Sequence, residues 1–216
     1  DWTSANQFVT ALYNRIFYQV SIANQYLRET TDAKLNERGV TGELRTDIQR
    51  YRAEVRFLRA LSYWHGIDLY GSIPFVTEDD AIGNVKPEQA TRQEIFNYIE
   101  SELKAIEGDL AAPKQGEYGR ADQAAAWTLL AKLYLNAQVY TGQARANDCL
   151  TYCNKVISSG AYSLQNNYRN IFKADNNTSP ETIFVVTFDG QATQTFGGMT
   201  FLINASVGGN MQAANY

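Results

Sequence analysis

The sequence predicts a mainly α-helical protein built of stacked helical pairs, followed by a region rich in loops with a short strand. Long stretches before residue 160 carry apolar residues at helical spacing without an internal proline. Short turns marked by Gly or Pro separate these stretches, which favours antiparallel neighbouring helices. After Gly160 the helical spacing gives way to a β-branched run and to scattered Gly, Asn, Ser and Thr.

The first predicted helix covers residues 6–27. It contains no internal Gly or Pro, and its apolar residues recur at helical spacing. The stripe consists of Phe8, Leu12, Ile16 and Val20, with Phe17, Ile22 and Tyr26 beside it. We therefore expect an amphipathic helix.

The second predicted helix is longer and covers residues 44–69, after a turn region at Gly39–Gly42. Its apolar stripe comprises Ile48, Tyr51, Val55, Leu58, Leu61 and Trp64. Much of the remaining surface is charged, which indicates a side that faces solvent or a partner. These charged residues are Arg50, Arg52, Glu54, Arg56 and Arg59. The helix should stop at Tyr70–Pro74, because Gly71 frees the backbone and Pro74 lacks a hydrogen-bond donor.

A third helix follows a polar loop at residues 75–90. Thr91 and Glu94 have the spacing of a capping box, in which the hydroxyl and the carboxylate each accept a bond from a free backbone amide. The apolar stripe then continues at helical spacing until Pro113. Its members are Ile95, Ile99, Leu103, Ile106 and Leu110.

Two further helices are predicted at residues 122–140 and 146–158, the second closing at Gly160. The first is rich in alanine, which lets a neighbouring helix approach closely. Residues 59–71 and 130–142 also echo each other, aligning Tyr63 with Tyr134 and Gly66 with Ala137. The offset is about twice the ~34-residue tetratricopeptide period, which supports tetratricopeptide-like helical pairs.

The last part of the chain has a different character. Thr182–Phe188 is β-branched and aromatic, and it lies between Pro180 and Gly190, so it predicts a strand. Glycine pairs and scattered polar residues follow. We expect residues 1–160 to be the helical portion, and 161–216 the loop and short-strand portion, of one domain.

Composition argues against several classes of function. The net charge is −4 with no concentrated basic run, which disfavours binding to nucleic acid. No apolar run reaches the ~18 residues of a membrane span. Cys149 and Cys153 stand four apart beside a single histidine, His65. They predict small, buried side chains rather than a zinc site, and His65 predicts a packed or surface-lodged ring.

The sequence contains no hydrolase, metalloprotease or phosphate-binding motif. Two pairs of carboxylates, Asp79 with Asp80 and Glu100 with Glu102, have the residue types of a glycosidase site. The first pair falls in a polar loop and the second on a charged helix side, so both predict solvated charge. We therefore expect no enzyme activity.

Three ordered blocks carry a resemblance to a known family. They are Arg52–Phe75 (RAEVRFLRALSYWHGIDLYGSIPF), Gly119–Gly142 (GRADQAAAWTLLAKLYLNAQVYTG) and Val156–Phe184, which includes Asn167-Tyr168, Ile171-Phe172 and Glu181-Thr-Ile-Phe. This order is similar to that of the SusD-like (SusD/RagB) family of outer-membrane glycan-binding lipoproteins, and within it most similar to the starch-binding branch.

The resemblance implies a lipid-anchored protein on the bacterial outer membrane that faces outward from the cell. It implies capture of starch or another α-glucan without cleavage, and delivery to a SusC-like TonB-dependent porin. On this view the chain is a fragment, without the family's N-terminal lipoprotein segment, which would carry the anchor, and without its C-terminal part. Binding of another glycan, or a helical-repeat scaffold that binds only protein, are the alternatives.

The resemblance also assigns site residues. Phe196, before Gly197-Gly198 and shortly after Asp189-Gly190, stands where the starch-binding branch places a Tyr that stacks on glucose. Tyr216 is a second candidate for stacking. The family's calcium loop corresponds to residues near Asp175–Asn177, but the acidic residues that should follow are missing. We therefore expect no metal and no cofactor, with calcium as the alternative.

Overall fold

The computed structural model describes residues 3, 5–83, 86–173 and 175–188. It forms two compact units, Asp1–Phe184 and Val185–Tyr216. Only residues 185–188 of the second unit are described, and they form neither helix nor strand. The first unit is mainly α-helical, as predicted. No helix in the described part of the chain is long and apolar enough to cross a membrane.

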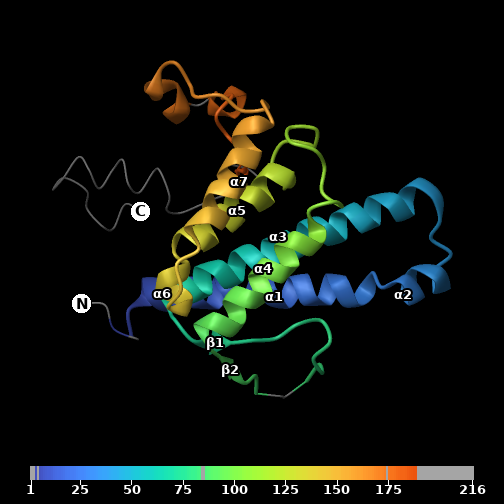
Figure 1. Cartoon of the computed structure of the whole chain (residues 1–216). Helices are drawn as coiled ribbons and strands as arrows, with labels where there is room; N and C mark the ends of the chain where they lie inside the picture. Colours follow the sequence, from blue (N-terminus) through green and yellow to red (C-terminus); the bar gives the residue numbers. More distant parts are fainter. Residues whose placement is uncertain (1–2, 4, 84–85, 174, 189–216) are drawn as a thin grey trace, which may run out of the picture. The chain divides into compact units, whose positions relative to one another are not determined.

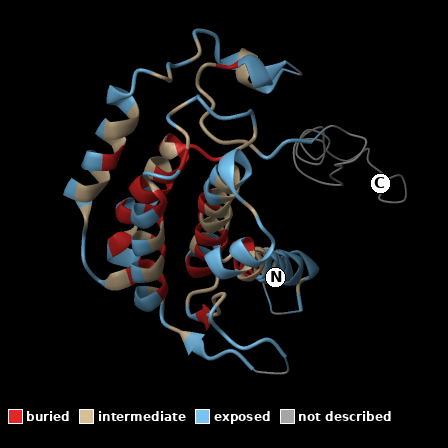
Figure 2. Cartoon of the chain, turned by 90° about the vertical axis from the view of Figure 1, so that its right-hand side faces the viewer, coloured by how far each residue is buried: buried red, intermediate tan, exposed pale blue. Residues whose placement is uncertain are grey.

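Each long helix of the first unit packs against the next long helix along the chain (Figure 1). α1 lies along α3, α3 along α4, and α5 along α7. The bounds are α1 Gln7–Glu29, α2 Asp32–Glu37, α3 Gly42–Leu69, α4 Arg92–Ile106, α5 Gln123–Leu135, α6 Ala137–Thr141 and α7 Ala146–Ser158. Figure 2 shows buried residues gathered on the helix faces that look toward one another, so the core lies between the helices.

Helix α1 begins where the side chain of Asn6 caps it, accepting from the backbone amides of Phe8 and Val9. The helix is confirmed, but only part of the expected apolar stripe is buried. Ile16 and Val20 face the core, whereas Phe8 is 65% exposed. Four residues turn a helix by about 400°, so a strict i, i+4 series drifts about 40° at each step. Over three steps it therefore leaves the face that α3 covers.

Helix α3 is the central helix of the unit, since it packs against α1, α4 and α5. Phe57, Ala60, Tyr63 and Ile67 are its most buried apolar residues. The side predicted to face solvent or a partner includes Arg59, which is only 1% exposed, so the prediction was wrong for this residue. Because neighbouring helices cover this helix on several sides, its charged residues meet partners inside the protein.

A small hairpin follows α3. Strands β1 Ile73–Pro74 and β2 Gln89–Ala90 pair antiparallel, with Ile73 opposite Ala90. A Cβ on Gly66 would lie 2.4 Å from Cδ1 of Ile73, so only glycine lets β1 pack this closely on α3. The sequence predicted a loop here, because two-residue strands are too short to show a period. The capping box of Thr91 and Glu94 then starts α4, as predicted.

The alanine-rich stretch forms two helices, with a break at Asn136 between α5 and α6. Gly142 ends α6 in the left-handed region, at φ 76°, as Gly71 follows α3 at φ 85°. Tyr63 and Tyr134, which the internal echo aligns, are both buried. Helix α7 has the predicted bounds, and Cys149 and Cys153 are free thiols that pack partly buried against the core.

The predicted strand at Thr182–Phe188 was wrong, because these residues carry no strand assignment in the structure. A strand needs a partner, and no described strand pairs with this segment. Its first apolar residues instead contribute to the helical core. The ring of Phe184 meets that of Phe57 edge to face, with centroids 5.2 Å apart.

Candidate functional site

A buried cluster of charges links α3 to three other parts of the chain. Nη1 of Arg59 donates to Oδ1 of Asn24 on α1 at 2.6 Å and to the Glu78 carboxylate. Nη2 of Arg59 donates to Oε2 of Glu102 on α4 at 3.0 Å, and Arg56 binds both oxygens of the same carboxylate. Both arginines belong to the first sequence block that resembles the family. Their side chains bind other residues of this chain.

Arginine also determines the ionisation of the two carboxylates. Burial alone would raise the pKa of Glu102, but hydrogen bonds and charge from Arg56 and Arg59 outweigh it and lower that pKa. For Glu78, burial is likewise outweighed by Arg59, and its pKa is also lowered. Both carboxylates are therefore ionised at neutral pH and paired. The expectation that Glu102 is solvated was wrong, since its side chain is 14% exposed.

Several side chains hold the segment that follows β1. The hydroxyl of Tyr63 bonds the backbone of Val76, and Nδ2 of Asn24 donates to the carbonyl of Val76 at 3.2 Å. Arg28 of α1 donates to the carbonyls of Thr77, Glu78 and Asp80, at 2.9, 2.7 and 3.0 Å. The course of residues 76–80 is therefore fixed by helices on either side.

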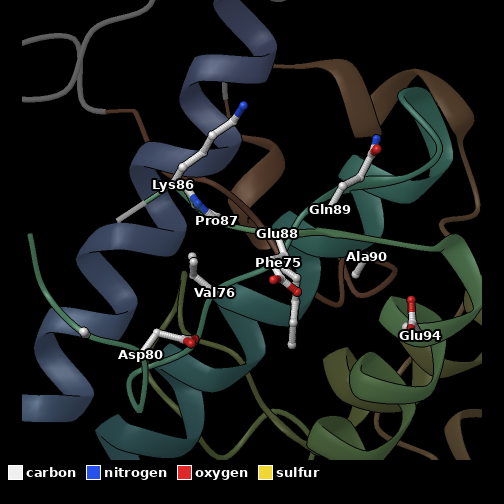
Figure 3. Close-up of a pocket in the computed structure, with 10 residues that line it drawn as sticks. Phe75, Val76, Asp80, Lys86, Pro87, Glu88, Gln89, Ala90 and Glu94 are labelled. Atoms are coloured by element: carbon white, nitrogen blue, oxygen red, sulfur yellow. The ribbon is translucent and has the colours of Figure 1, made fainter. Parts of the chain in front are cut away.

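This segment forms one wall of a cavity of about 440 Å³, which we call the hairpin pocket. Its described lining residues are Phe75, Val76, Asp80, Ala81, Lys86, Pro87, Glu88, Gln89, Ala90 and Glu94. In Figure 3, Glu88 lies near the centre of the view, with Asp80 on one side and Glu94 on the other. Phe75 donates its backbone amide to the carbonyl of Glu88 at 3.1 Å, which extends the pairing of the hairpin.

Two carboxylates of the hairpin pocket are fixed by neighbouring threonines. Oδ2 of Asp80 accepts from the amide of Thr77 at 2.7 Å, and Oε2 of Glu94 accepts from the amide of Thr91 at 2.7 Å. The amide and hydroxyl of Thr91 also lower the pKa of Glu94. Among the described residues, no hydrogen bond or ion pair reaches the side-chain charge of Glu88. The lining of the pocket therefore combines hydrogen-bond acceptors with apolar side chains.

Another cavity, of about 330 Å³, lies between α3, α5 and residues 181–184, and we call it the interhelix groove. Most of its lining is apolar, and it includes the side chains of Phe57, Trp64 and Phe184. Nζ of Lys132 lies 5.4 Å from the centroid of the Trp64 ring. The aromatic rings that line the interhelix groove can pack against an apolar surface, but few polar groups line it.

The other residues considered for chemistry are engaged in structural contacts or exposed. Glu100 accepts from the Tyr134 hydroxyl at 2.7 Å and pairs with Lys104 and Arg145, so the expectation of solvated charge was wrong for it as well. Asp79 is exposed, as expected. His65 is also exposed, and its ring lies 4.8 Å from that of Trp64, which confirms a surface-lodged ring.

The two predicted stacking residues, Phe196 and Tyr216, lie outside the described residues, as does the Asp189-Gly190 pair before them. Near the calcium-loop match, Nδ2 of Asn176 donates to the carbonyl of Ile171 at 3.1 Å. Within the described ranges, no three His, Cys, Asp or Glu side chains could together hold a metal ion. Sequence reasoning missed the hairpin pocket. The only available signal was the cluster of charges in the loop after Pro74.

Comparison with known proteins gives a consistent family assignment. Residues 1–135 match the model of a SusD-like family described as starch-binding and associating with the outer membrane. The starch-binding protein SusD of Bacteroides thetaiotaomicron is 40% identical over 206 residues, which is 94% of this chain and 35% of that protein. A SusD-like protein of Formosa agariphila is 32% identical over 69% of this chain and 27% of its own length. The chain thus spans about a third of the curated relatives it matches.

Solved structures share the fold. A SusD-like carbohydrate-binding protein of Bacteroides fragilis superposes with a TM-score of 0.69 at 21% identity, over 86% of this chain and 34% of that one. A structure solved with a xylogluco-oligosaccharide gives a TM-score of 0.71 at 22% identity, over 87% and 37% of the two chains. A laminarin-binding SusD-like protein gives 0.65 at 21% identity, over 81% and 36%. At these identities the likeness is one of fold.

Proposed function

The chain belongs to the SusD-like family described as starch-binding and associating with the outer membrane, and from this premise we propose that its protein captures starch or a related α-glucan. The observation that carries the proposal is the 40% identity to starch-binding SusD over 94% of this chain. This chain corresponds to only 35% of the length of that relative. We therefore propose, from this similarity, which ligand the whole protein binds.

The main alternative is another glycan. Structures of the same fold include one solved with a xylogluco-oligosaccharide and one described as laminarin-binding. Glycan capture is common to these relatives, while the sugar differs between them. Starch is preferred here because the starch-binding relative is far more similar in sequence than the other two structures are.

We place Phe196 in the ligand site, with Tyr216 as a second contact. An aromatic ring offers a flat apolar face to a sugar ring, and the two glycines after Phe196 leave space beside it. The described unit would then serve as a helical scaffold. Its buried charges are occupied in packing one helix against the next, as the contact between Arg59 and Glu102 illustrates.

We further propose that the protein binds without cleaving its ligand, at the cell surface, through a lipid anchor. A SusC-like TonB-dependent transporter would receive the glycan. Support for the location comes from the family description, which associates these proteins with the outer membrane. Support for binding without hydrolysis comes from the carboxylates Glu100 and Glu102, whose ion pairs leave them poorly placed to act as acid and nucleophile.

A binding panel tests the proposal. Isothermal titration of the protein against α-glucans, laminarin, xyloglucan, xylan, inulin and mannan should show binding to the α-glucans. The protein should also be retarded in a gel that contains starch, and it should release no reducing sugar from maltoheptaose or pullulan. Binding only to a different glycan would overturn the substrate, and steady hydrolysis by the clean protein would overturn capture without cleavage.

A further inference from the structure

The hairpin pocket has the features of a ligand site that the family resemblance does not assign. We propose that it is a second carbohydrate site, which takes one or two sugar residues of a neutral glycan and lies apart in sequence from Phe196. The inference rests on the proposed function, since it assumes that the protein meets glycans. It concerns only residues that the structure describes.

The size of the pocket suits such a ligand. Its volume of about 440 Å³ lies within the roughly 300–1,000 Å³ range of small-molecule sites. Phe75, Val76 and Ala90 give the lining an apolar part, against which the C–H face of a sugar can pack. Asp80, Glu88 and Glu94 supply the polar part, so the lining has the mixed character that a sugar requires.

The apolar part of the pocket is held in place before any ligand arrives. The ring of Phe75 packs against the rings of Tyr63 and Tyr98, with centroids 5.3 and 4.7 Å away. The Tyr63 hydroxyl holds the backbone of Val76. A ligand would therefore not have to order this wall, which removes a cost that weakens many binding events.

Hydrogen-bond acceptors in the pocket are also pre-positioned. Asp80 and Glu94 each use one carboxylate oxygen to accept two bonds from a threonine, Thr77 or Thr91. Oδ1 of Asp80 and Oε1 of Glu94 make none of the hydrogen bonds found among the described residues, and the Glu88 carboxylate is likewise without one. Sugar hydroxyls donate well to such ionised acceptors, and these bonds are stronger than those between neutral groups.

Charge indicates which glycans the pocket accepts. The described lining contains three carboxylates and a single ammonium, that of Lys86, so it has an excess of negative charge. Uronic acids and sulfated sugars would be repelled, whereas neutral hexoses would not. A metal ion is not the better occupant. These carboxylates are not among any group of three that could hold one in the described part of the chain.

Two variants and a control test the assignment. Ala81→Trp places a large side chain in the pocket from an exposed position, and Glu88→Gln keeps the shape of the side chain but removes its charge. Glu37→Gln is the matched control, because Glu37 is an exposed carboxylate at the end of α2, away from the pocket lining. Thermal melting should show that all three variants fold as the parent does.

Isothermal titration with maltotriose and laminaritriose then gives the answer. For at least one trisaccharide we expect two sites per protein, reduced to one by Ala81→Trp, with the second site weakened at least 5-fold by Glu88→Gln. Glu37→Gln should change nothing, and digalacturonate should not compete. A single site that both pocket variants leave unchanged would overturn this inference but not the proposed function. Failure of the parent protein to bind any glycan of the panel would overturn both.

Discussion

Tyr63 binds Val76 at both of its backbone polar atoms. Its hydroxyl donates to the carbonyl of Val76 at 2.5 Å and accepts from the amide of Val76 at 3.0 Å. Tyr63 is fully buried on the central helix, and Val76 lies two residues beyond β1. One side chain thus supplies the pairing that a further strand residue would otherwise give, and it joins the helical core to the wall of the hairpin pocket.

Replacing Tyr63 with Phe should lower the free energy of unfolding by about 1–3 kcal/mol, because the amide and carbonyl of Val76 lose a buried partner. Burial raises the pKa of Tyr63 to about 12, so the hydroxyl is neutral and the loss should be the same at pH 6 and pH 9. Urea denaturation measures it. Tyr118→Phe, at a 56% exposed position, is the control and should change stability by less than about 0.5 kcal/mol.

If Tyr63→Phe proved as stable as the parent, Val76 would have to find other partners, and the link between α3 and the hairpin would not be important for folding. A loss of the second glycan site without a loss of stability would indicate instead that the hydroxyl acts only by holding Val76 in the wall of the pocket. Both quantities should therefore be measured on the same preparation.

Stability should fall in acid because of the paired carboxylates Glu78 and Glu102. Arg56 and Arg59 hold the pKa of Glu102 below its ordinary value, and Arg59 does the same for Glu78. A pKa that is lower in the folded state gives stability above the unfolded pKa of about 4.3, and this stability disappears as pH falls below it. The free energy of unfolding should therefore decline as the pH falls from about 5 through the lowered pKa values of these two carboxylates.

Glu102→Gln separates this effect from general acid unfolding. It should cost about 3 kcal/mol at pH 7, because two arginines of the buried cluster lose their ionised partner. Its decline with acid should be shallower than that of the parent. Glu29→Gln is the control, since Lys34 and Arg38 lower the pKa of Glu29 at the surface, and a much smaller loss is expected there. Parallel pH curves for Glu102→Gln and the parent would contradict the assignment.

Features that depend on residues close together in the sequence were predictable, and features that depend on distant residues were not. Helix α4 was predictable because its cap and its stripe are local, and the cap and the stripe from Ile95 to Ile106 are confirmed. The predicted end was wrong, because the helix stops at Ile106 and Leu110 is buried outside it. The burial of Arg59 was not, because its partners Asn24, Glu78 and Glu102 lie 35, 19 and 43 residues away. A helical pattern reports which side is charged, but it does not report that another helix brings opposite charges to that side.

The hairpin pocket escaped prediction for a related reason. Strands of two residues have no period to detect, and the pairing of Ile73 with Ala90 spans a polar loop. The close contact of Gly66 with Ile73 was equally invisible, because an isolated glycine in a helix predicts only lower helical stability. For the ligand site, Phe196 and Tyr216 were assigned through the family resemblance, and they stay predictions.

Gly66→Ala should destabilise the protein although alanine is the better helix former. The new Cβ would lie 2.4 Å from Cδ1 of Ile73, and Ile73 is 1% exposed, so its side chain has no free space to move into. Overpacking of this kind costs about 1–3 kcal/mol, against a gain in helix propensity of up to about 1 kcal/mol. A net loss of about 1 kcal/mol should appear in urea denaturation.

Ile73→Val removes the Cδ1 atom in question and completes a double-mutant cycle. Alone it should cost about 1 kcal/mol, because a buried methyl group is lost. Combined with Gly66→Ala, it should cost less than the sum of the two single changes, by about 1 kcal/mol or more. Strict additivity would show that the protein accommodates the new methyl by shifting the backbone of the hairpin instead.

Phe196 is the residue on which the proposed ligand site depends most directly. If its ring stacks on a sugar, Phe196→Ala should weaken α-glucan binding by about 1–2 kcal/mol, roughly 5–30-fold, with little change in melting temperature. A ring packed in the core would give the opposite result, with a loss of stability of about 3 kcal/mol or more and no direct effect on affinity.

Titration and thermal melting of the same variant distinguish the two, and Phe184→Ala provides the comparison. Since the Phe184 ring contacts Phe57 in the helical core, that variant should lose stability and keep its affinity. If Phe196→Ala behaves like Phe184→Ala, Phe196 is not part of the site, and the search for stacking residues moves to Tyr216.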